Sequence, residues 1–193
     1  MVVAIDCDPG HDDVVAILYA ARHLDLRAVT VVAGNAPLAE CTANALAMTE
    51  AAGIPVPVHV GAAGPIVGKP AHAPQGHGPS GLGGADRPAY TKKPEPGRAV
   101  DALLKLADQH AGKLRIAAVG PLTNIALCLL MEPGFADAVA EVSIMGGAVG
   151  TGGITAAAEF NFFADPVAAR IVLESRLNLR VVGYDITKDV GLR

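Results

Sequence analysis

The feature that most constrains the fold of this 193-residue chain is a regular alternation of short apolar segments with longer helical ones. Strands are predicted over residues 2–6, 27–33, 56–60, 114–119, 141–145 and 179–184. Helices are predicted over residues 12–23, 37–52, 97–110, 122–131 and 165–174. Such alternation is typical of an open, mostly parallel sheet with helices on both faces. We therefore predict a single α/β domain with a Rossmann-like core over residues 1–193.

The composition agrees with a sheet that is buried on both sides. Hydrophobic residues make up 51% of the chain but aromatic residues only 4%, with no Trp, so small and branched aliphatic side chains must build the core. Residues 61–96 form the exception to the alternation. This segment is rich in Gly, Pro and His and is far longer than a usual connection, so we predict a long loop there.

Four aspartates lie within eight residues where the first predicted strand ends, in the sequence Asp6-Cys7-Asp8-Pro9-Gly10-His11-Asp12-Asp13. Two carboxylates held ~4 Å apart repel by about 4 kcal/mol at an effective dielectric near 20, so the acids must share protons, spread apart or surround a cation. The carboxyl ends of strands are where open α/β sheets bind ligands. Because oxygen ligands at this density favour Ca²⁺ or Mg²⁺ over Zn²⁺, the sequence predicts a hard-metal site.

Composition also argues against several classes of partner. The net charge is −4 and no Lys/Arg cluster is present, so we expect no nucleic-acid partner. No apolar run approaches the ~20 residues of a membrane helix, and the start of the chain lacks a signal-peptide pattern, so we expect a cytoplasmic protein that does not bind membranes. The three cysteines lack metal-ligand spacing and are expected to be reduced and packed.

The segment Asp6–Asp13, called the acidic turn below, resembles the N-terminal signature of the inosine/uridine-preferring nucleoside hydrolases. Further motifs of that family follow in order along essentially the whole chain: Val31-Val32-Ala33-Gly34-Asn35, His77-Gly78, Gly81-Leu82-Gly83, Gly120-Pro121-Leu122-Thr123-Asn124, Met145-Gly146-Gly147 and Glu159-Phe160-Asn161. The resemblance implies a Ca²⁺-dependent hydrolase that uses a calcium-bound water to split ribonucleosides into ribose and free base. It also implies a homo-oligomer, a dimer or tetramer, in the full-length form.

The resemblance assigns roles to particular residues. Asp8 matches a residue that binds calcium and takes a proton from the attacking water, while Asp13 and the Val119 carbonyl match the other calcium ligands. Residues matching substrate-binding positions are Asp12, Asn35, Glu159, Asn161 and, in the long loop, His77. Breaking an N-glycosidic bond builds oxocarbenium-like positive charge on the sugar, and a ring of carboxylates stabilises such charge.

Two other functions remain open at this point. An Asp-x-Asp phosphatase would use Asp6 as nucleophile and Asp8 as acid, but it leaves Asp12 and Asp13 without a role. A nucleoside- or ribose-binding domain of the same fold would bind the sugar without cleaving it. A purely structural role is also possible, in which Asp12 and Asp13 only interact with the dipole of a helix. Each such interaction contributes ~0.3–1 kcal/mol, but this role does not explain the presence of Asp6 and Asp8.

The sequence departs from the family in two places. Gly153 stands six residues before Glu159, where family members usually carry an Asn that binds the 5′ side of the ribose. Family chains also continue further and contribute a His-Asp pair, of which the Asp completes the calcium shell and the His lies near the base. Because residues 1–193 lack that segment, the chain is either a truncated form of a longer enzyme, which we favour, or a divergent protein without full activity. In both cases we expect it to bind calcium weakly and turn over poorly. The sequence of residues 1–193 does not show whether purine or pyrimidine nucleosides are preferred.

Overall fold

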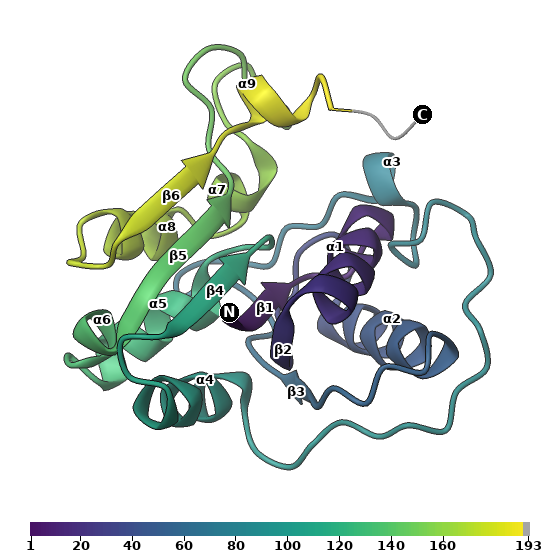
Figure 1. Ribbon diagram of the computed structural model, residues 1–193. Helices are drawn as coiled ribbons and strands as arrows, with labels where there is room; N and C mark the ends of the chain where they lie inside the picture. Colours follow the sequence, from purple (N-terminus) through teal and green to yellow (C-terminus); the bar gives the residue numbers. More distant parts are fainter. Residues whose placement is uncertain (191–193) are drawn as a thin grey trace.

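The computed structural model describes residues 1–190 and contains one six-stranded sheet (Figure 1). All strand pairings are parallel, in the order β3-β2-β1-β4-β5-β6. The strands are β1 (Val2–Cys7), β2 (Asp25–Val31), β3 (Val58–Val60), β4 (Leu114–Ala118), β5 (Val139–Met145) and β6 (Leu179–Val182). The predicted open, parallel α/β architecture is confirmed.

The five predicted helices are present with small differences at their ends. They are α1 (His11–His23), α2 (Leu38–Ala51), α4 (Ala99–Gln109), α5 (Thr123–Met131) and α8 (Pro166–Leu173). Four short helices were not predicted: α3 (Pro74–His77), α6 (Phe135–Ala138), α7 (Phe160–Ala164) and α9 (Tyr184–Thr187). Each has only four or five residues, which is too short for a hydrophobic periodicity to show in the sequence.

Four expectations are corrected by these short helices and by the strand ends. The loop over residues 61–96 is interrupted by α3, and the last strand ends at Val182, where the prediction ran to residue 184. The second strand begins and ends two residues before its predicted bounds of 27–33. A helical turn, α9, follows the last strand, although nothing in the sequence there indicated a helix.

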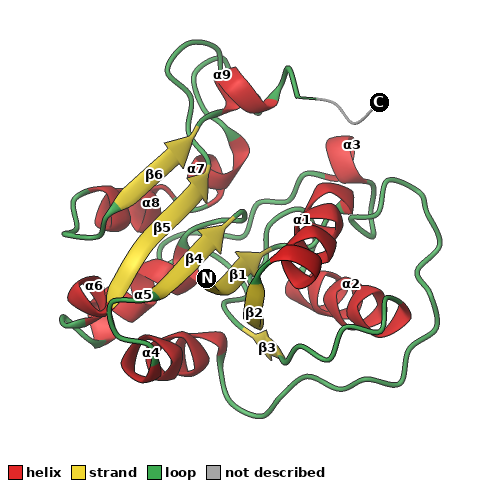
Figure 2. Cartoon of the chain, viewed as in Figure 1, coloured by secondary structure: helices red, strands yellow, loops and turns green. Residues whose placement is uncertain are grey.

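The central strand β1 separates two hydrophobic cores. Val3, Ile5 and Cys7 point to one face and pack with buried residues of α1 and α2. Ala4 points to the other face and packs with buried residues of α4, α5 and α8. Figure 2 shows these helices on both sides of the sheet. Burying one such Ile, Val or Leu side chain stabilises the fold by about 1.5–3 kcal/mol, so the two cores hold β1 firmly in the middle of the sheet.

The chain changes direction across the sheet between β1 and β4. From β1 it proceeds outward to β2 and β3, and it then returns through the long loop to β4 on the opposite side of β1. Asp6 pairs with Ala118, so the two neighbouring strands end at the same level. Asp8 and Val119 follow directly after these ends. Ligands of open α/β sheets bind at such a switch point, at the carboxyl ends of the strands.

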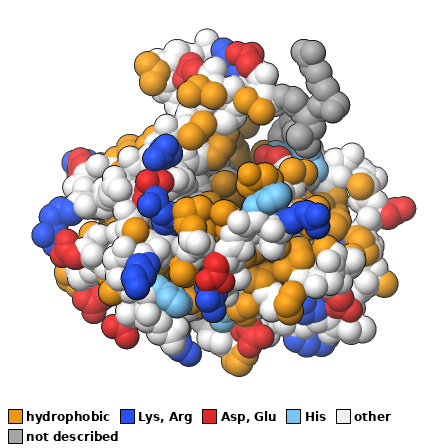
Figure 3. Space-filling model, in the orientation of Figure 1, with side chains coloured by type: hydrophobic (Ala, Val, Ile, Leu, Met, Phe, Trp, Pro, Cys, Tyr) orange, Lys and Arg blue, Asp and Glu red, His pale blue; other side chains and the backbone are white. Residues whose placement is uncertain are grey.

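The surface agrees with the modest net charge. On the face shown in Figure 3, Lys and Arg side chains are scattered among acidic and hydrophobic ones and do not gather into a patch. Within residues 1–190, no helix is long and apolar enough to cross a membrane. All three cysteines are free and buried, as predicted.

Candidate active site

Two buried carboxylates form the centre of the site. Asp8 follows β1 and is 1% exposed, and Asp13 lies in the first turn of α1 and is 4% exposed. Asn35, just beyond β2, connects them. Its backbone N–H donates to Asp8 Oδ2 at 2.6 Å, and its side-chain Nδ2 donates to the Asp8 carbonyl at 3.1 Å and to Asp13 Oδ2 at 3.4 Å. Three predicted site residues from three elements therefore meet at the switch point.

Each of these acids keeps one oxygen without a partner. Among residues 1–190, no group donates a hydrogen bond to the buried oxygens Asp8 Oδ1 and Asp13 Oδ1. Burial, with the charge of Asp13 adding to it, raises the pKa of Asp8 well above its ordinary value. Burial, with the charge of Asp12 adding to it, raises the pKa of Asp13 to about 8. Buried charges without partners are costly, and a hard divalent cation is the ligand that would satisfy both oxygens. The residues present therefore fit a hard divalent metal ion.

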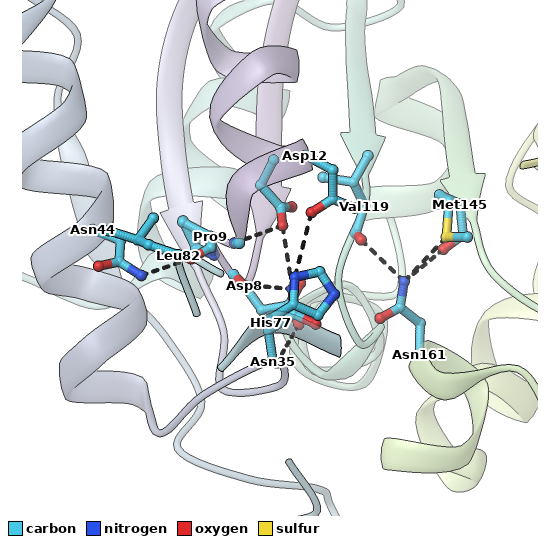
Figure 4. A network of polar contacts seen from close by, with 12 residues as sticks. Asp8, Pro9, Asp12, Asn35, Asn44, His77, Leu82, Val119, Met145 and Asn161 are labelled. Atoms are coloured by element: carbon cyan, nitrogen blue, oxygen red, sulfur yellow. Dashed lines mark hydrogen bonds and ion pairs between the residues drawn. The ribbon is translucent and has the colours of Figure 1, made fainter. Parts of the chain in front are cut away.

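The Val119 carbonyl lies on the β4 side of the same site (Figure 4). Asn161 Nδ2 donates to it at 3.0 Å and to the Met145 carbonyl at 3.0 Å. The carbonyl oxygen has a second lone pair that remains free to bind another group. The next residue is Gly120, where a Cβ would lie 2.6 Å from Asp8 Oδ1, so a side chain at this position would displace the Asp8 carboxylate.

Asp6 supports the site from beneath. It is fully buried, and its Oδ1 accepts hydrogen bonds from Thr30 Oγ1 at 2.6 Å and from Asn124 Nδ2 at 2.8 Å. Burial raises the pKa of Asp6 to about 6, and these two hydrogen bonds oppose that increase. Asn124 also accepts from the Ala62 N–H at 3.0 Å, so it ties the long loop to the sheet. A fully buried Asp6 cannot reach a phosphate ester, which disfavours the phosphatase alternative.

Glu159 and Asn161 lie near the ends of β4 and β5, but the Glu159 carboxylate is held by the backbone. As N-cap of α7 it accepts from the N–H groups of Asn161 at 2.8 Å and Phe162 at 3.2 Å, and it also accepts from Gly147 at 2.9 Å. It is only 4% exposed. The family motif around Glu159 thus shapes the local backbone, which the sequence alone did not indicate.

His77 and Asp12 lie at the solvent-facing side of the site. The last residue of α3 is His77, and its Nδ1 lies 3.8 Å from Asp12 Oδ1, whose side chain is 70% exposed. A Cβ on Gly10 would lie 2.6 Å from His77 Nδ1 and 2.9 Å from Asn35 Nδ2, so glycine lets the loop approach the acidic turn. Burial lowers the pKa of His77, and the attraction of Asp12 only partly opposes this effect.

Two groups at the site were missed by the sequence reasoning. Asn44 is fully buried in α2, and its Nδ2 donates to the carbonyls of Pro9 at 2.9 Å and Ser80 at 2.7 Å. Arg87 Nε donates to Asn44 Oδ1 at 2.7 Å, and its guanidinium also pairs with Glu40. The polar Asn44 among alanines and a leucine was a usable signal. Nothing in the sequence paired Arg87 with it.

Gly153, the departure from the family pattern, has an aromatic neighbour. A Cβ on Gly153 would lie 3.3–3.5 Å from ring atoms of Tyr184. Tyr184 is the first residue of α9, the helical turn that was not predicted. The ring therefore occupies the space beside the glycine, so an Asn side chain at this position would have to share that space with it.

Comparisons with known proteins agree with this geometry. The family model for inosine-uridine preferring nucleoside hydrolases matches residues 3–193. The chain is 41% identical over 187 residues to a pyrimidine-specific ribonucleoside hydrolase, RihB, of Escherichia coli (strain HS), a match that covers 96% of this chain and 60% of that relative. The chain thus spans about three fifths of the length of this curated relative.

Solved structures of similar proteins share the fold. A plant nucleoside hydrolase, the PpNRh1 enzyme, superposes with a TM-score of 0.92 at 37% identity and covers 98% of this chain and 61% of its own. A purine-preferring ribonucleoside hydrolase from Gardnerella vaginalis superposes with a TM-score of 0.95 at 30% identity and covers 100% of this chain and 63% of its own. The relatives are named for different base preferences, one pyrimidine-specific and one purine-preferring, so they do not choose between purine and pyrimidine for this chain.

Proposed function

This chain belongs to the inosine-uridine preferring nucleoside hydrolase family, and on that premise we propose that it forms the metal- and sugar-binding part of an enzyme that hydrolyses the N-glycosidic bond of ribonucleosides. The products are ribose and the free base. The observation that carries the proposal is the pair of buried carboxylates, Asp8 and Asp13, each with an unpaired oxygen and both bonded to Asn35. Their position at the switch point of the sheet supports a ligand site.

Calcium is the cation that this donor set favours. Asp8 Oδ1, Asp13 Oδ1 and the Val119 carbonyl are all hard oxygen donors, and no thiolate or imidazole lies among them. Bound calcium would supply a positive centre that holds the sugar hydroxyls and acidifies a water molecule. Asp8 would accept the proton of the attacking water, because the backbone N–H of Asn35 fixes its carboxylate in place.

The remaining residues would orient the sugar. The exposed carboxylate of Asp12 is free to accept hydrogen bonds from ribose hydroxyls, and His77 lies beside it. Glu159 and Asn161 would contact ribose through the acceptor capacity that their backbone hydrogen bonds leave unused. The carboxylates would also stabilise the positive charge that develops on the sugar in the transition state.

Calorimetry and a ribose-release assay test the proposal together. The chain should bind Ca²⁺, and Asp8→Asn should abolish detectable binding and lower the rate of ribose release by about 10²–10⁴-fold, the usual contribution of a general base. The exposed Asp108→Asn variant is the matched control and should behave as wild type.

Other outcomes would favour other functions. Nucleoside binding without base release, also in a chain extended to the full family length, would support a binding domain. Phosphate release that survives Asp12→Ala and Asp13→Ala would support a phosphatase. The homo-oligomeric full-length form, the single-domain organisation and the cytoplasmic location remain predictions, and size-exclusion chromatography with light scattering checks the first of them.

A further inference from the structure

A second cluster of metal-ligating side chains lies outside the buried acid pair. It consists of His11 and Asp12 at the start of α1 and His77 at the end of α3, and one ligand atom from each lies within 4.8 Å of the others. The two imidazole rings are in contact, with centroids 4.7 Å apart and planes inclined by 32°. Figure 4 shows the His77 ring beside Asp12. Two elements that are distant in sequence therefore present three donors to one small region.

The contacts within the protein do not satisfy these donors. His77 Nδ1 is buried and has no hydrogen-bond partner in the part of the chain that the structure describes, and its distance of 3.8 Å from Asp12 Oδ1 is too long for a hydrogen bond. His11 and Asp12 are exposed, so their side chains are free to move by the small amount that closes the cluster. Ligands at about 2.0–2.1 Å from a tetrahedral ion lie roughly 3.3 Å from one another, which the present spacing approaches.

The chemistry of this cluster differs from that of the buried acids. Two imidazoles and one carboxylate suit Zn²⁺ and other borderline divalent metals, whereas Ca²⁺ prefers oxygen donors alone. Three protein ligands leave a fourth position for water or another small ligand, as in open zinc sites. A protein with both clusters would therefore sort two kinds of cation between neighbouring sites.

We propose that His11, Asp12 and His77 form a second metal site, selective for Zn²⁺ over Ca²⁺, that joins α3 of the long loop to the N-terminus of α1. Zinc in this site occupies the Asp12 carboxylate and fixes His77 over the acidic turn. The consequence for catalysis depends on the proposed function, in which Asp12 binds ribose. Zinc then inhibits ribose release by competing with the sugar.

Zinc binding is measured first, without reference to activity. Isothermal titration calorimetry with Zn²⁺ is carried out on the whole chain in buffer that already contains Ca²⁺. His11→Ala and His77→Ala should each weaken Zn²⁺ binding at least about tenfold, since even the loss of an outer-shell partner costs ~10–100-fold. His23→Ala, which removes an exposed histidine from the other end of α1, should leave binding unchanged.

Spectroscopy distinguishes loss of the metal site from loss of the fold in the variants. Co²⁺ added to wild type should produce visible absorption bands of a histidine-containing site, and these bands should disappear in His77→Ala while its circular dichroism spectrum stays that of wild type. The proposal is overturned if Zn²⁺ affinity is the same in wild type, His11→Ala and His77→Ala, or if His23→Ala weakens it equally.

The ribose-release assay separates this inference from the proposed function. If the chain cleaves nucleosides and Zn²⁺ inhibits wild type but not His11→Ala, both are supported. A different result overturns the zinc site alone. In that case the chain cleaves nucleosides, Zn²⁺ does not inhibit cleavage, and the Zn²⁺ affinity is the same in wild type, His11→Ala and His77→Ala. Histidine-dependent Zn²⁺ binding in a chain of full family length that never releases ribose overturns the hydrolase and keeps the metal site.

Discussion

Gly34 packs directly against the carboxylate of Asp8. A Cβ on Gly34 would overlap the carboxylate, lying 2.8 Å from its Cγ, and a Cβ on Gly120 would lie 2.6 Å from Asp8 Oδ1 on the other side. Neither glycine has a positive φ, so close approach and not backbone conformation requires glycine at both positions. The two glycines thus make room for the Asp8 carboxylate from opposite sides, with its unpaired oxygen Oδ1 on the side of Gly120.

Gly34→Ala should therefore damage the metal site more than the fold. The added methyl group forces the Asp8 side chain to move, so we expect Ca²⁺ affinity to fall at least tenfold and stability to fall by about 1–3 kcal/mol, the usual cost of overpacking. Calorimetry with Ca²⁺ and urea denaturation measure the two effects. Gly76→Ala is the control, because a Cβ there meets nothing within 4 Å and the φ is not positive. Wild-type Ca²⁺ affinity in Gly34→Ala would contradict the prediction.

Without metal, the protein should lose stability as pH rises. The folded-state pKa is raised to about 6 for Asp6 and to about 8 for Asp13, from an ordinary value of 3.8. The stabilisation that these two protonated acids contribute is fully present below the unfolded-state pKa. It is lost as pH rises towards and through the folded-state pKa values, because the unfolded chain releases these protons at lower pH than the folded chain. We expect the free energy of unfolding in EDTA to fall by a few kcal/mol between about pH 4 and about pH 8.

Urea denaturation in EDTA across this range measures the effect. Asp13→Asn should flatten the pH profile, because the amide does not titrate, whereas the exposed Asp108→Asn variant should keep the wild-type slope. Saturating Ca²⁺ should restore stability at the alkaline end, by about 2.7 kcal/mol at a hundredfold excess over Kd. A metal-free protein that becomes more stable as pH rises would show that the buried acids are not held protonated by the fold.

The alternation of strands and helices in the sequence was sufficient to predict the sheet and the position of the acidic turn. Apolar strands such as Val2–Cys7 and helices of eight or more residues carry their own pattern. The family resemblance, and not the strand pattern, implied that Asp8 and Val119 act together, and the pairing of Asp6 with Ala118 in neighbouring strands places both at one edge. Short helical turns such as α7 and α9 carry no such pattern, because their conformation depends on caps and contacts that form only in the fold.

What the sequence did not reveal are contacts between distant segments. The pairing of Arg87 with Asn44 crosses 43 residues, and the contact of Tyr184 with Gly153 joins the first residue of α9 to a loop. Neither involves a spacing that a local pattern can indicate. The motif around Glu159 was found by its resemblance, but its hydrogen bonds to backbone N–H groups depend on the turn at Gly147, which only the folded chain shows.

An Asn at position 153, where the family usually carries one, should compete with the Tyr184 ring for the same space. Gly153→Asn places a Cβ 3.3 Å from the ring, so we expect a loss of stability of about 1 kcal/mol. In a Tyr184→Ala background the same change should cost much less, since the space is open. A double-mutant cycle by urea denaturation measures the coupling, expected at about 0.5–3 kcal/mol for residues in contact. Equal costs in both backgrounds would mean that the two residues do not compete for this space.

The side-chain amide of Asn161 should be indispensable as a donor. Its Nδ2 donates to the carbonyls of both Val119 and Met145, so Asn161→Asp replaces the donor by an ionised acceptor that faces two other acceptors. The aspartate would be stabilised in its protonated form, which raises its folded-state pKa, and the resulting loss of stability therefore grows with pH. We expect a destabilisation of about 1–3 kcal/mol at neutral pH, which urea denaturation measures, and a smaller one in acid. The exposed Asn178→Asp serves as control, because its amide contacts only the Ala140 carbonyl at the surface. A pH-independent loss in Asn161→Asp would indicate that charge repulsion at the ends of β4 and β5 is not its cause.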